Sequence, residues 1–195
     1  MRRTIPFVCI ITIIICLTAA SGYADGSEDI ITILTEGKTN WFFTAEPVED
    51  ADLVTILQAG ANTPSAINEQ PWHFSVVTDP EIITELADTE STRQAPVMVL
   101  ISVTSGNEMK LVDAGLACQS MQIAARALGY ATKIETSAAR TVRNDQSGDW
   151  AEMLSIPDGK TARVALFIGH EDETIDAVTS ASARLSLEEV VSFVK

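Results

Sequence analysis

Apolar residues recur at helical spacing in five segments of the chain, and residues that begin or end helices bound those segments. Acidic, hydroxyl or proline residues stand before most of them, as is typical of the first turn of a helix. Glycine follows three of them, which is typical of a helix C-terminus. The pattern predicts helices over residues 27–36, 49–59, 80–87, 107–128 and 150–154.

The longest of these segments is apolar nearly all round from Leu111 onward. Its many alanines leave little polar surface and would let neighbouring elements approach closely. A helix without a polar face is buried inside a domain. We therefore expect residues 107–128 to form the buried spine of the fold.

Runs of β-branched and aromatic residues predict strands between the helices. The run from Pro96 to Val103 is apolar at nearly every position, which indicates a central strand covered on both faces. Further extended segments are expected over residues 72–77, 130–136, 163–168 and 187–194. Helices and strands do not alternate regularly, and no Gly-x-Gly-x-x-Gly follows a strand, which disfavours a Rossmann fold. The pattern favours an α+β sandwich with a central mixed sheet.

The first 24 residues are interpreted as a secretory signal peptide. Arg2 and Arg3 precede an apolar run over residues 5–17, and small residues lead to a cleavage site after Ala24. A retained membrane anchor is the alternative, but the apolar run is shorter than the roughly 20 residues that a spanning helix needs. The expected mature chain is a single domain over residues 25–195 that is secreted or periplasmic.

Charge and cysteine content narrow the function classes. The formal net charge is −14, and it becomes −16 when Arg2 and Arg3 leave with the signal peptide. Nucleic acid is not an expected partner of so acidic a protein. Cys118 is the one cysteine that remains after cleavage. We therefore expect neither an intrachain disulfide nor a metal site.

The stretch from Thr63 to Val77 carries the strongest candidate chemistry. Pro64 and Pro71 stiffen a loop that runs into a predicted strand. Between the prolines lie three uncharged hydrogen-bonding side chains, those of Ser65, Asn68 and Gln70. A loop of this kind presents amides in fixed directions to a planar ligand with a polar edge.

The pattern Pro-Ser-x-x-Asn-x-Gln-Pro-Trp, followed by a strand, resembles the flavin-contacting loop of the nitroreductase family, and the likeness runs from about Thr35 to Val194. The resemblance implies an FMN-dependent oxidoreductase that works as a homodimer, with the flavin at the subunit interface. It assigns Ser65, Asn68 and Gln70 to the flavin, and it implies that the long helix and the C-terminal tail lie at the dimer contact. No catalytic side chain is assigned, because the flavin carries the redox chemistry.

The same resemblance implies two phosphate-binding segments, and this chain departs from the family in the first. Where relatives usually carry an Arg-Arg-Ser-x-Arg-like cluster, this chain has Gly37-Lys38-Thr39-Asn40-Trp41, so two expected cations are missing. Lys38 and Thr39 remain able to contact phosphate, and Trp41 is expected to cover the flavin or close its phosphate entrance. The second segment keeps Arg184, which either binds phosphate or pairs with a nearby glutamate in solvent.

Glu135 and Thr136 fall where many relatives carry Glu-Gly, whose backbone approaches the reactive nitrogen of the flavin. Thr136 keeps the backbone N–H donor but adds a side chain at the glycine position, where it would crowd the flavin. Asp113 also matches a family position and is expected to hold structure. Cys118 is expected to be a small core residue.

Two functions from different classes remain open on the sequence. In the first, an exported flavoprotein passes electrons to a small-molecule acceptor in two half-reactions. Such an enzyme has little access to nicotinamide nucleotides, so we expect a non-nicotinamide donor such as a membrane quinol or a redox protein. In the second, the thinned phosphate cluster prevents firm flavin binding, and the chain is a binding or structural module on the same dimeric scaffold.

Overall fold

The computed structural model describes residues 30–36, 39–87, 92, 94–175 and 184–194. The predicted signal peptide and Lys38 lie outside these residues, so cleavage after Ala24 and the role of Lys38 stay predictions. No helix in the described part of the chain is both long and apolar enough to cross a membrane.

The elements follow the predicted order closely. The helices are α1 (Ile30–Glu36), α2 (Asp50–Ala61), α3 (Pro80–Leu86), α4 (Met109–Ala127), α5 (Ser137–Asn144), α6 (Asp149–Met153) and α7 (Leu187–Val190), with a short 3₁₀ turn η1 (Ala66–Asn68). The strands are β1 (Trp72–Val77), β2 (Val97–Thr104), β3 (Ala131–Glu135) and β4 (Lys160–Gly169). The five helices and the first four extended segments expected from the hydrophobic pattern are all present within a few residues of their expected bounds.

The four strands form one sheet in the order β1-β2-β4-β3, and every neighbouring pair is antiparallel. The expectation of a mixed sheet is therefore wrong. Strand β2 is buried at every position except Thr104, as its apolar run predicted. A continuous apolar run suggests a parallel neighbour, but here it arises because β2 is central and helices cover both of its faces.

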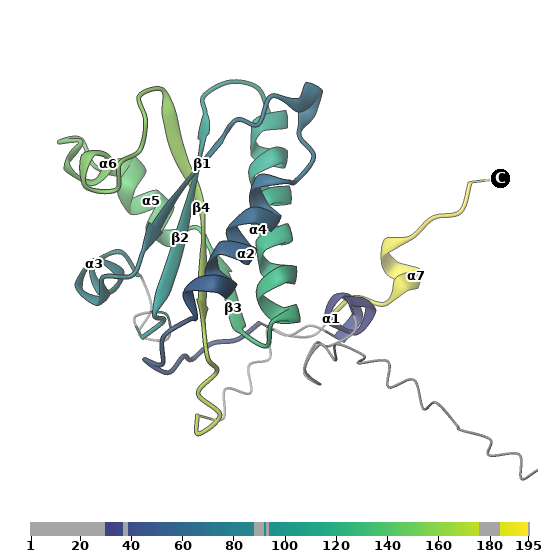
Figure 1. The fold of residues 1–195 in the computed structure, drawn as a ribbon. Helices are drawn as coiled ribbons and strands as arrows, with labels where there is room; N and C mark the ends of the chain where they lie inside the picture. Colours follow the sequence, from purple (N-terminus) through teal and green to yellow (C-terminus); the bar gives the residue numbers. More distant parts are fainter. Residues whose placement is uncertain (1–29, 37–38, 88–91, 93, 176–183, 195) are drawn as a thin grey trace, which may run out of the picture.

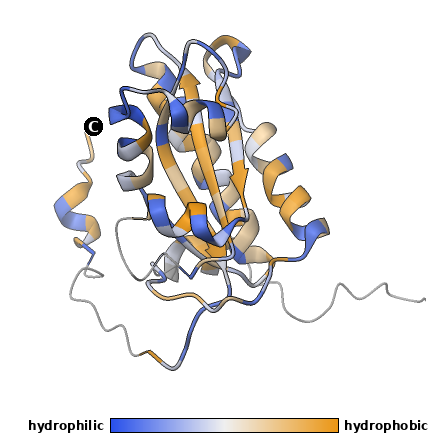
Figure 2. Ribbon diagram, turned by 90° about the vertical axis from the view of Figure 1, so that its left-hand side faces the viewer, coloured by the Kyte–Doolittle hydropathy of each residue, from blue (hydrophilic) through white to orange (hydrophobic). Residues whose placement is uncertain are grey.

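Helices lie on both sides of the sheet, and Figure 2 shows the hydrophobic strands enclosed between them. On one face, α3, α5 and α6 cover a core that includes Leu100 and Phe167 (Figure 1). On the other face, α2 and α4 cover a core that includes Ile101 and Leu166. Neighbouring strand residues thus enter opposite cores, as the pleat of a sheet requires.

Helix α4 is buried on one face only, so the expectation of a fully buried spine is half right. Its inner face carries Cys118 and Met121, both buried. Helix α2 approaches this region closely, since a Cβ added at Gly60 would lie 2.7 Å from the Cγ of Met121. The outer face of α4 carries three large apolar residues that are each 45–48% exposed, Leu111, Val112 and Leu116. An apolar stripe of this kind on a helix marks a contact surface.

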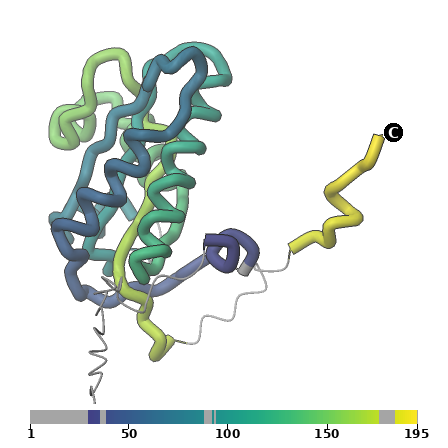
Figure 3. Tube along the Cα trace, turned by 45° about the vertical axis from the view of Figure 1, so that its right-hand side comes forward, coloured from purple at the N-terminus to yellow at the C-terminus, as the bar shows by residue number. Residues whose placement is uncertain are grey.

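Two short helices were not predicted. Helix α5 buries Ala138, Ala139 and Val142, and two of those three are alanines, which give a weak apolar pattern. Helix α7 occupies a tail expected to be extended; that expectation is wrong because Ser186 and Glu189 form a capping box that starts a helical turn. Figures 1 and 3 show α1 and α7 beyond α4 on the side away from the sheet.

Candidate functional site

The loop between α2 and β1 is attached to the body of the domain at both ends. The Asp113 carboxylate of α4 accepts a hydrogen bond from the backbone N–H of Ala66 (N···Oδ1 3.1 Å). The Pro71 carbonyl oxygen accepts hydrogen bonds from the Thr104 backbone N–H, at 3.2 Å, and from the Lys160 ammonium group. Asp113 therefore has the structural role expected from the sequence, and the loop has a fixed position.

The backbone inside this loop is strained. Ile67, Asn68 and Gln70 have φ angles of 50°, 58° and 49°, a region that residues other than glycine seldom occupy. The Ser65 hydroxyl accepts a hydrogen bond from the Gln70 backbone N–H at 2.9 Å, and the Gln70 amide donates to Asn68 Oδ1 at 3.3 Å. Asn68 and Gln70 are exposed. Strained backbone often occurs where a ligand binds, and this loop holds two amide side chains outward from a fixed position.

A cavity of about 440 Å³ opens between the N-terminal half of α4 and the ends of β3 and β4. Most of its wall is made of small or apolar side chains, Ala114, Gly115, Cys118, Ile134 and Val164 among them. A Cβ added at Gly115 would meet no atom within 4 Å, so the wall is open there. Thr136 borders the cavity at the end of β3.

Thr136 and Glu135 have different roles in this structure. The φ angle of Thr136 is −116°, which any residue adopts, so the threonine needs no glycine-like backbone. The Glu135 carboxylate pairs with Lys133 (Oε2···Nζ 3.5 Å) and accepts a hydrogen bond from the Ser137 hydroxyl at 2.6 Å. Of the two, Thr136 borders the cavity and Glu135 orders the end of the strand.

The segment that resembles the first phosphate site runs beside β3. Thr39 is exposed, whereas Asn40 is buried and accepts a hydrogen bond from the Thr132 backbone N–H through its Oδ1 (3.1 Å). Trp41 is half-buried, with its ring centroid 4.4 Å from the Lys133 ammonium nitrogen. Its indole N–H is buried and has no hydrogen-bond partner among the described residues. Trp41 is thus attached to β3 by a cation–π contact.

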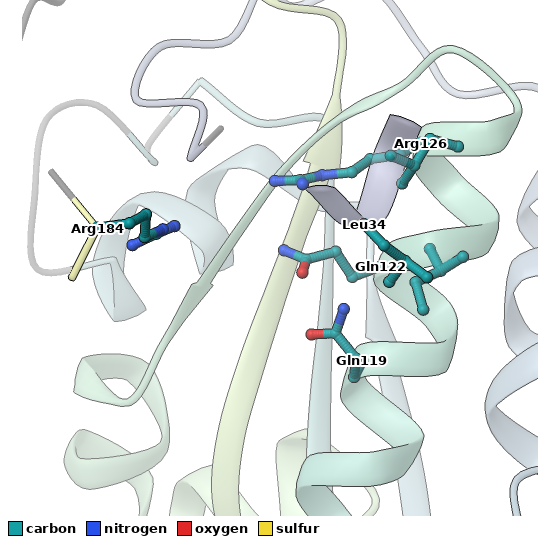
Figure 4. Close-up of a pocket in the computed structure, with 7 residues that line it drawn as sticks. Leu34, Gln119, Gln122, Arg126 and Arg184 are labelled. Carbon is teal, nitrogen blue, oxygen red and sulfur yellow. The ribbon is translucent and has the colours of Figure 1, made fainter. Parts of the chain in front are cut away.

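A second cavity, of about 190 Å³, lies between α1, the C-terminal half of α4 and Arg184. Figure 4 shows Gln119, Gln122 and Arg126 projecting from α4 on the side where Arg184 lies. Arg126 also donates from Nε to the Thr132 hydroxyl at 3.0 Å, and Thr132 pairs with the N-terminal segment. The two segments expected to bind phosphate therefore meet around Arg126, which our sequence reasoning did not select.

One chain brings the predicted site residues together only in part. Thr136 borders the larger cavity and Arg184 the smaller one, and the two cavities follow one another along α4. Asn68 and Gln70 border neither. Their loop is attached through Asp113, whose side chain points about 200° around the helix from the position of Gly115.

Arg143 and Arg163 also border the larger cavity, and our sequence reasoning gave them no role. A signal was present for Arg163, because it is a charged residue at the start of an apolar strand. Arg143 lies in α5, which the hydrophobic pattern did not predict. Its proximity to Arg163 could not be read from spacing along the chain.

Cys118 borders the same cavity but lies almost entirely in the core. Burial raises the pKa of its thiol to about 12. The thiol is therefore protonated at neutral pH and unreactive as a nucleophile. Cys118 acts as a small apolar residue, as expected from the sequence.

Comparison with known proteins agrees with this architecture. The sequence matches the family model described as Nitroreductase family over residues 41–92 and 88–170. It is 31% identical over 169 residues to the FMN reductase (NAD(P)H) of Bacillus subtilis, an alignment that covers 73% of this chain and 66% of that protein.

Several solved structures share the fold. A nitroreductase with bound FMN from Bacteroides fragilis has a TM-score of 0.73 at 17% identity, over 86% of this chain and 100% of that one. A BluB-like flavoprotein from Clostridium difficile has a TM-score of 0.74 at 17% identity, with the same coverage. These likenesses confirm the α+β sandwich fold. Because the family match also spans more than half of the sequence, the chain belongs to the Nitroreductase family of oxidoreductases, as its Pro64–Trp72 loop predicted.

Proposed function

We propose that this chain is an FMN-dependent oxidoreductase that works as a homodimer and passes electrons through bound flavin in two half-reactions. The observation that carries this proposal is the succession of two cavities along α4, one open and largely apolar, the other small and basic. FMN has the same division, with a flat ring system at one end and a phosphate at the other. Bound FMN in structures of the same fold supports the cofactor assignment.

The larger cavity fits the ring end of the cofactor. Ala114 and Gly115 leave a shallow wall on α4, and the space beyond Gly115 is open. Apolar walls with a few polar groups at the edge are typical of cofactor sites. Thr136 provides such a group at the end of β3, in agreement with the position implied by the family resemblance.

The smaller cavity fits the phosphate end. Arg184 and Arg126 supply guanidinium groups, and Gln119 and Gln122 supply amides (Figure 4). Gln122 is seven residues from Gly115, which corresponds to about 10.5 Å along the helix, a separation suited to a ribityl chain between ring and phosphate. We assign Thr39 and Lys38 to the same phosphate as further contacts.

The homodimer is supported by apolar surface that one chain leaves uncovered. Large apolar residues of α1 and of the tail are exposed as well, including Ile31, Leu187 and Phe193. Figure 3 shows α1 and the tail on the same side of α4. A second copy on this side would cover the stripe and bring its own loop, with Asn68 and Gln70, towards the cavities. The flavin would then lie between two subunits.

Within such a dimer, the chain holds and shields the cofactor. FMN, when bound, supplies the electron transfer itself. The side-chain amides of Asn68 and Gln70 would hydrogen-bond the polar edge of the ring, and the strained loop would keep them in place with little loss of freedom on binding. The apolar wall and the partner subunit exclude water. No side chain is needed as an acid or base in this scheme.

Titration of the purified protein with FMN tests the proposal. We expect a yellow protein after supplementation, with quenched flavin fluorescence and a stoichiometry of one FMN per chain. The first-segment cations are few, so some flavin is expected to be lost on gel filtration. A colourless protein with unquenched FMN would support the other hypothesis, a family scaffold that acts as a binding or structural module.

The electron donor follows from the proposed export of residues 25–195 to the periplasm or beyond. Nicotinamide nucleotides are scarce outside the cytoplasm, so we expect slow reduction by NADH or NADPH and faster reduction by a membrane quinol or a redox protein. Anaerobic bleaching of the bound flavin with each donor measures this. Fast, saturable bleaching by NADPH at micromolar concentration would contradict the prediction and place this domain with its relative named FMN reductase (NAD(P)H).

A further inference from the structure

Arg163 is the extra residue of a β-bulge. In the pairing of β2 with β4, Ile101 lies opposite Val164 and Ser102 lies opposite Ala162, so Arg163 has no partner residue. Successive residues of a regular strand point to opposite faces, yet Arg163 and Val164 border the same cavity. The bulge thus turns a charged side chain into the cavity proposed for the flavin ring, which is a known use of bulges near functional sites.

A second guanidinium lies next to the bulge. Arg143, in the last turn of α5, donates from Nη1 to the carbonyl oxygen of Ala162 at 2.9 Å and borders the same cavity. Its pKa is lowered by burial, and then by the like charges of Arg163 and Arg140. The charges that act on Arg143 are therefore positive, although the whole chain has 27 acidic residues against 13 basic ones.

Neither arginine has an anionic partner in the described part of the chain. The ion pairs found there join Lys110 to Glu69, Lys133 to Glu135 and His170 to Glu46. The Nε–H of Arg163 is buried and has no hydrogen-bond partner among those residues. A buried guanidinium N–H without an acceptor is destabilising. One buried donor without an acceptor, beside a second guanidinium at the same cavity, is best explained by a ligand that brings a negative charge.

The oxidised flavin ring does not bring that charge. Its polar edge offers neutral carbonyl and ring-nitrogen acceptors, and the phosphate is assigned to the other cavity, around Arg184. In the oxidised enzyme the negative charge must therefore come from a second molecule, which meets the ring at this cavity. The wall between α4 and β3 is apolar, with Ala114, Ile134 and Val164, so the body of that molecule should be flat and apolar.

We propose that Arg143 and Arg163 form a carboxylate-binding site that selects small aromatic carboxylates as substrates of this enzyme. The planar forks of two guanidinium groups match the two oxygens of a carboxylate. This inference rests on the proposed function, because the bound carboxylate is a substrate only if the chain is an oxidoreductase. The binding site itself consists of residues of the chain and is tested separately from the flavin.

The test compares benzoate with its neutral isostere benzamide by calorimetric titration of the full-length protein, after FMN binding has been measured on its own. We expect benzoate to bind about tenfold more tightly than benzamide or better. Arg163→Gln should weaken benzoate binding about tenfold and leave benzamide within about twofold, on the scale of a charge-assisted hydrogen bond. If no FMN binds, the proposed function fails, and the same titration of the flavin-free protein still decides this inference.

Arg140→Gln is the matched control. Arg140 lies on the same helix as Arg143 but does not border the cavity. Its replacement by glutamine removes one positive charge, as Arg163→Gln does. We expect this substitution to change benzoate binding by less than about threefold, because the charge of Arg140 interacts with the bound carboxylate only at long range. Arg163→Lys keeps the charge without the fork and should recover part of the affinity.

Three results would overturn the proposal. The first is equal binding of benzoate and benzamide to the unaltered protein, a comparison that needs no variant to fold. The second is an effect of Arg140→Gln as large as that of Arg163→Gln. The third is a loss of FMN affinity in Arg163→Gln with unchanged benzoate binding, which would assign the two arginines to the flavin.

Discussion

Leu116→Glu is expected to convert the proposed homodimer to a monomer and to release most of the bound FMN. Leu116 belongs to the apolar stripe on α4 and exposes 45% of its surface. In a two-fold dimer the substitution occurs twice, so two unpaired carboxylates would enter one interface. Each would cost a few kcal/mol, which corresponds to a dimer dissociation constant raised about a thousandfold or more. Sedimentation velocity and flavin absorbance of the same samples measure both effects.

Met153→Glu is the control for this variant. Met153 is an exposed apolar residue of α6, on the opposite face of the sheet from α4. We expect this variant to stay dimeric and yellow. A Leu116→Glu protein that remained dimeric would place the interface elsewhere. A monomer that kept its flavin fully would show that one chain suffices for the cofactor, and that the loop with Asn68 acts without a partner.

Arg184→Ala is expected to weaken FMN binding by about 10- to 100-fold. The family resemblance implies that the first phosphate segment of this chain lacks two cations, so Arg184 should carry a larger share of the phosphate affinity than in relatives with the full cluster. A hydrogen bond to a charged group contributes about 1.5–3 kcal/mol, which is this range of affinity. Fluorescence titration of the flavin-free protein gives the dissociation constant.

Two further variants define what Arg184 does. Arg184→Lys should fall between the native protein and the alanine variant, since a lysine keeps the charge and loses the planar fork. Lys38→Ala should have a smaller effect than Arg184→Ala. If Arg184→Ala left the affinity unchanged, Arg184 would be a solvent-facing residue, and Arg126 with the two glutamines of α4 would have to hold the phosphate.

The sequence by itself determined the elements and the family. Helix spacing, end signals and β-prone runs depend on residues that are close along the chain, and these placed α2, α4, β1 and β2 almost correctly. The loop from Pro64 to Trp72 was readable for the same reason, because two prolines restrict the backbone locally and its polar residues lie within a few positions. The two helices that were not predicted also depend on residues close along the chain. Helix α5 has a weak apolar pattern because of its alanines, and a capping box starts α7.

The tertiary structure decided where these parts meet. Arg163 faces the cavity because β2 and β4 pair with a one-residue shift, and Arg143 reaches the same place only because α5 packs across β4. The loop and the two cavities lie on different sides of α4, which no spacing along the chain reveals. Pairing register and helix packing depend on contacts between residues far apart in sequence. For that reason the candidate ligand groups were partly predictable one by one. The position of Thr136 at one cavity and of Arg184 at another, and the arginine pair at the first of them, became visible only in the folded chain.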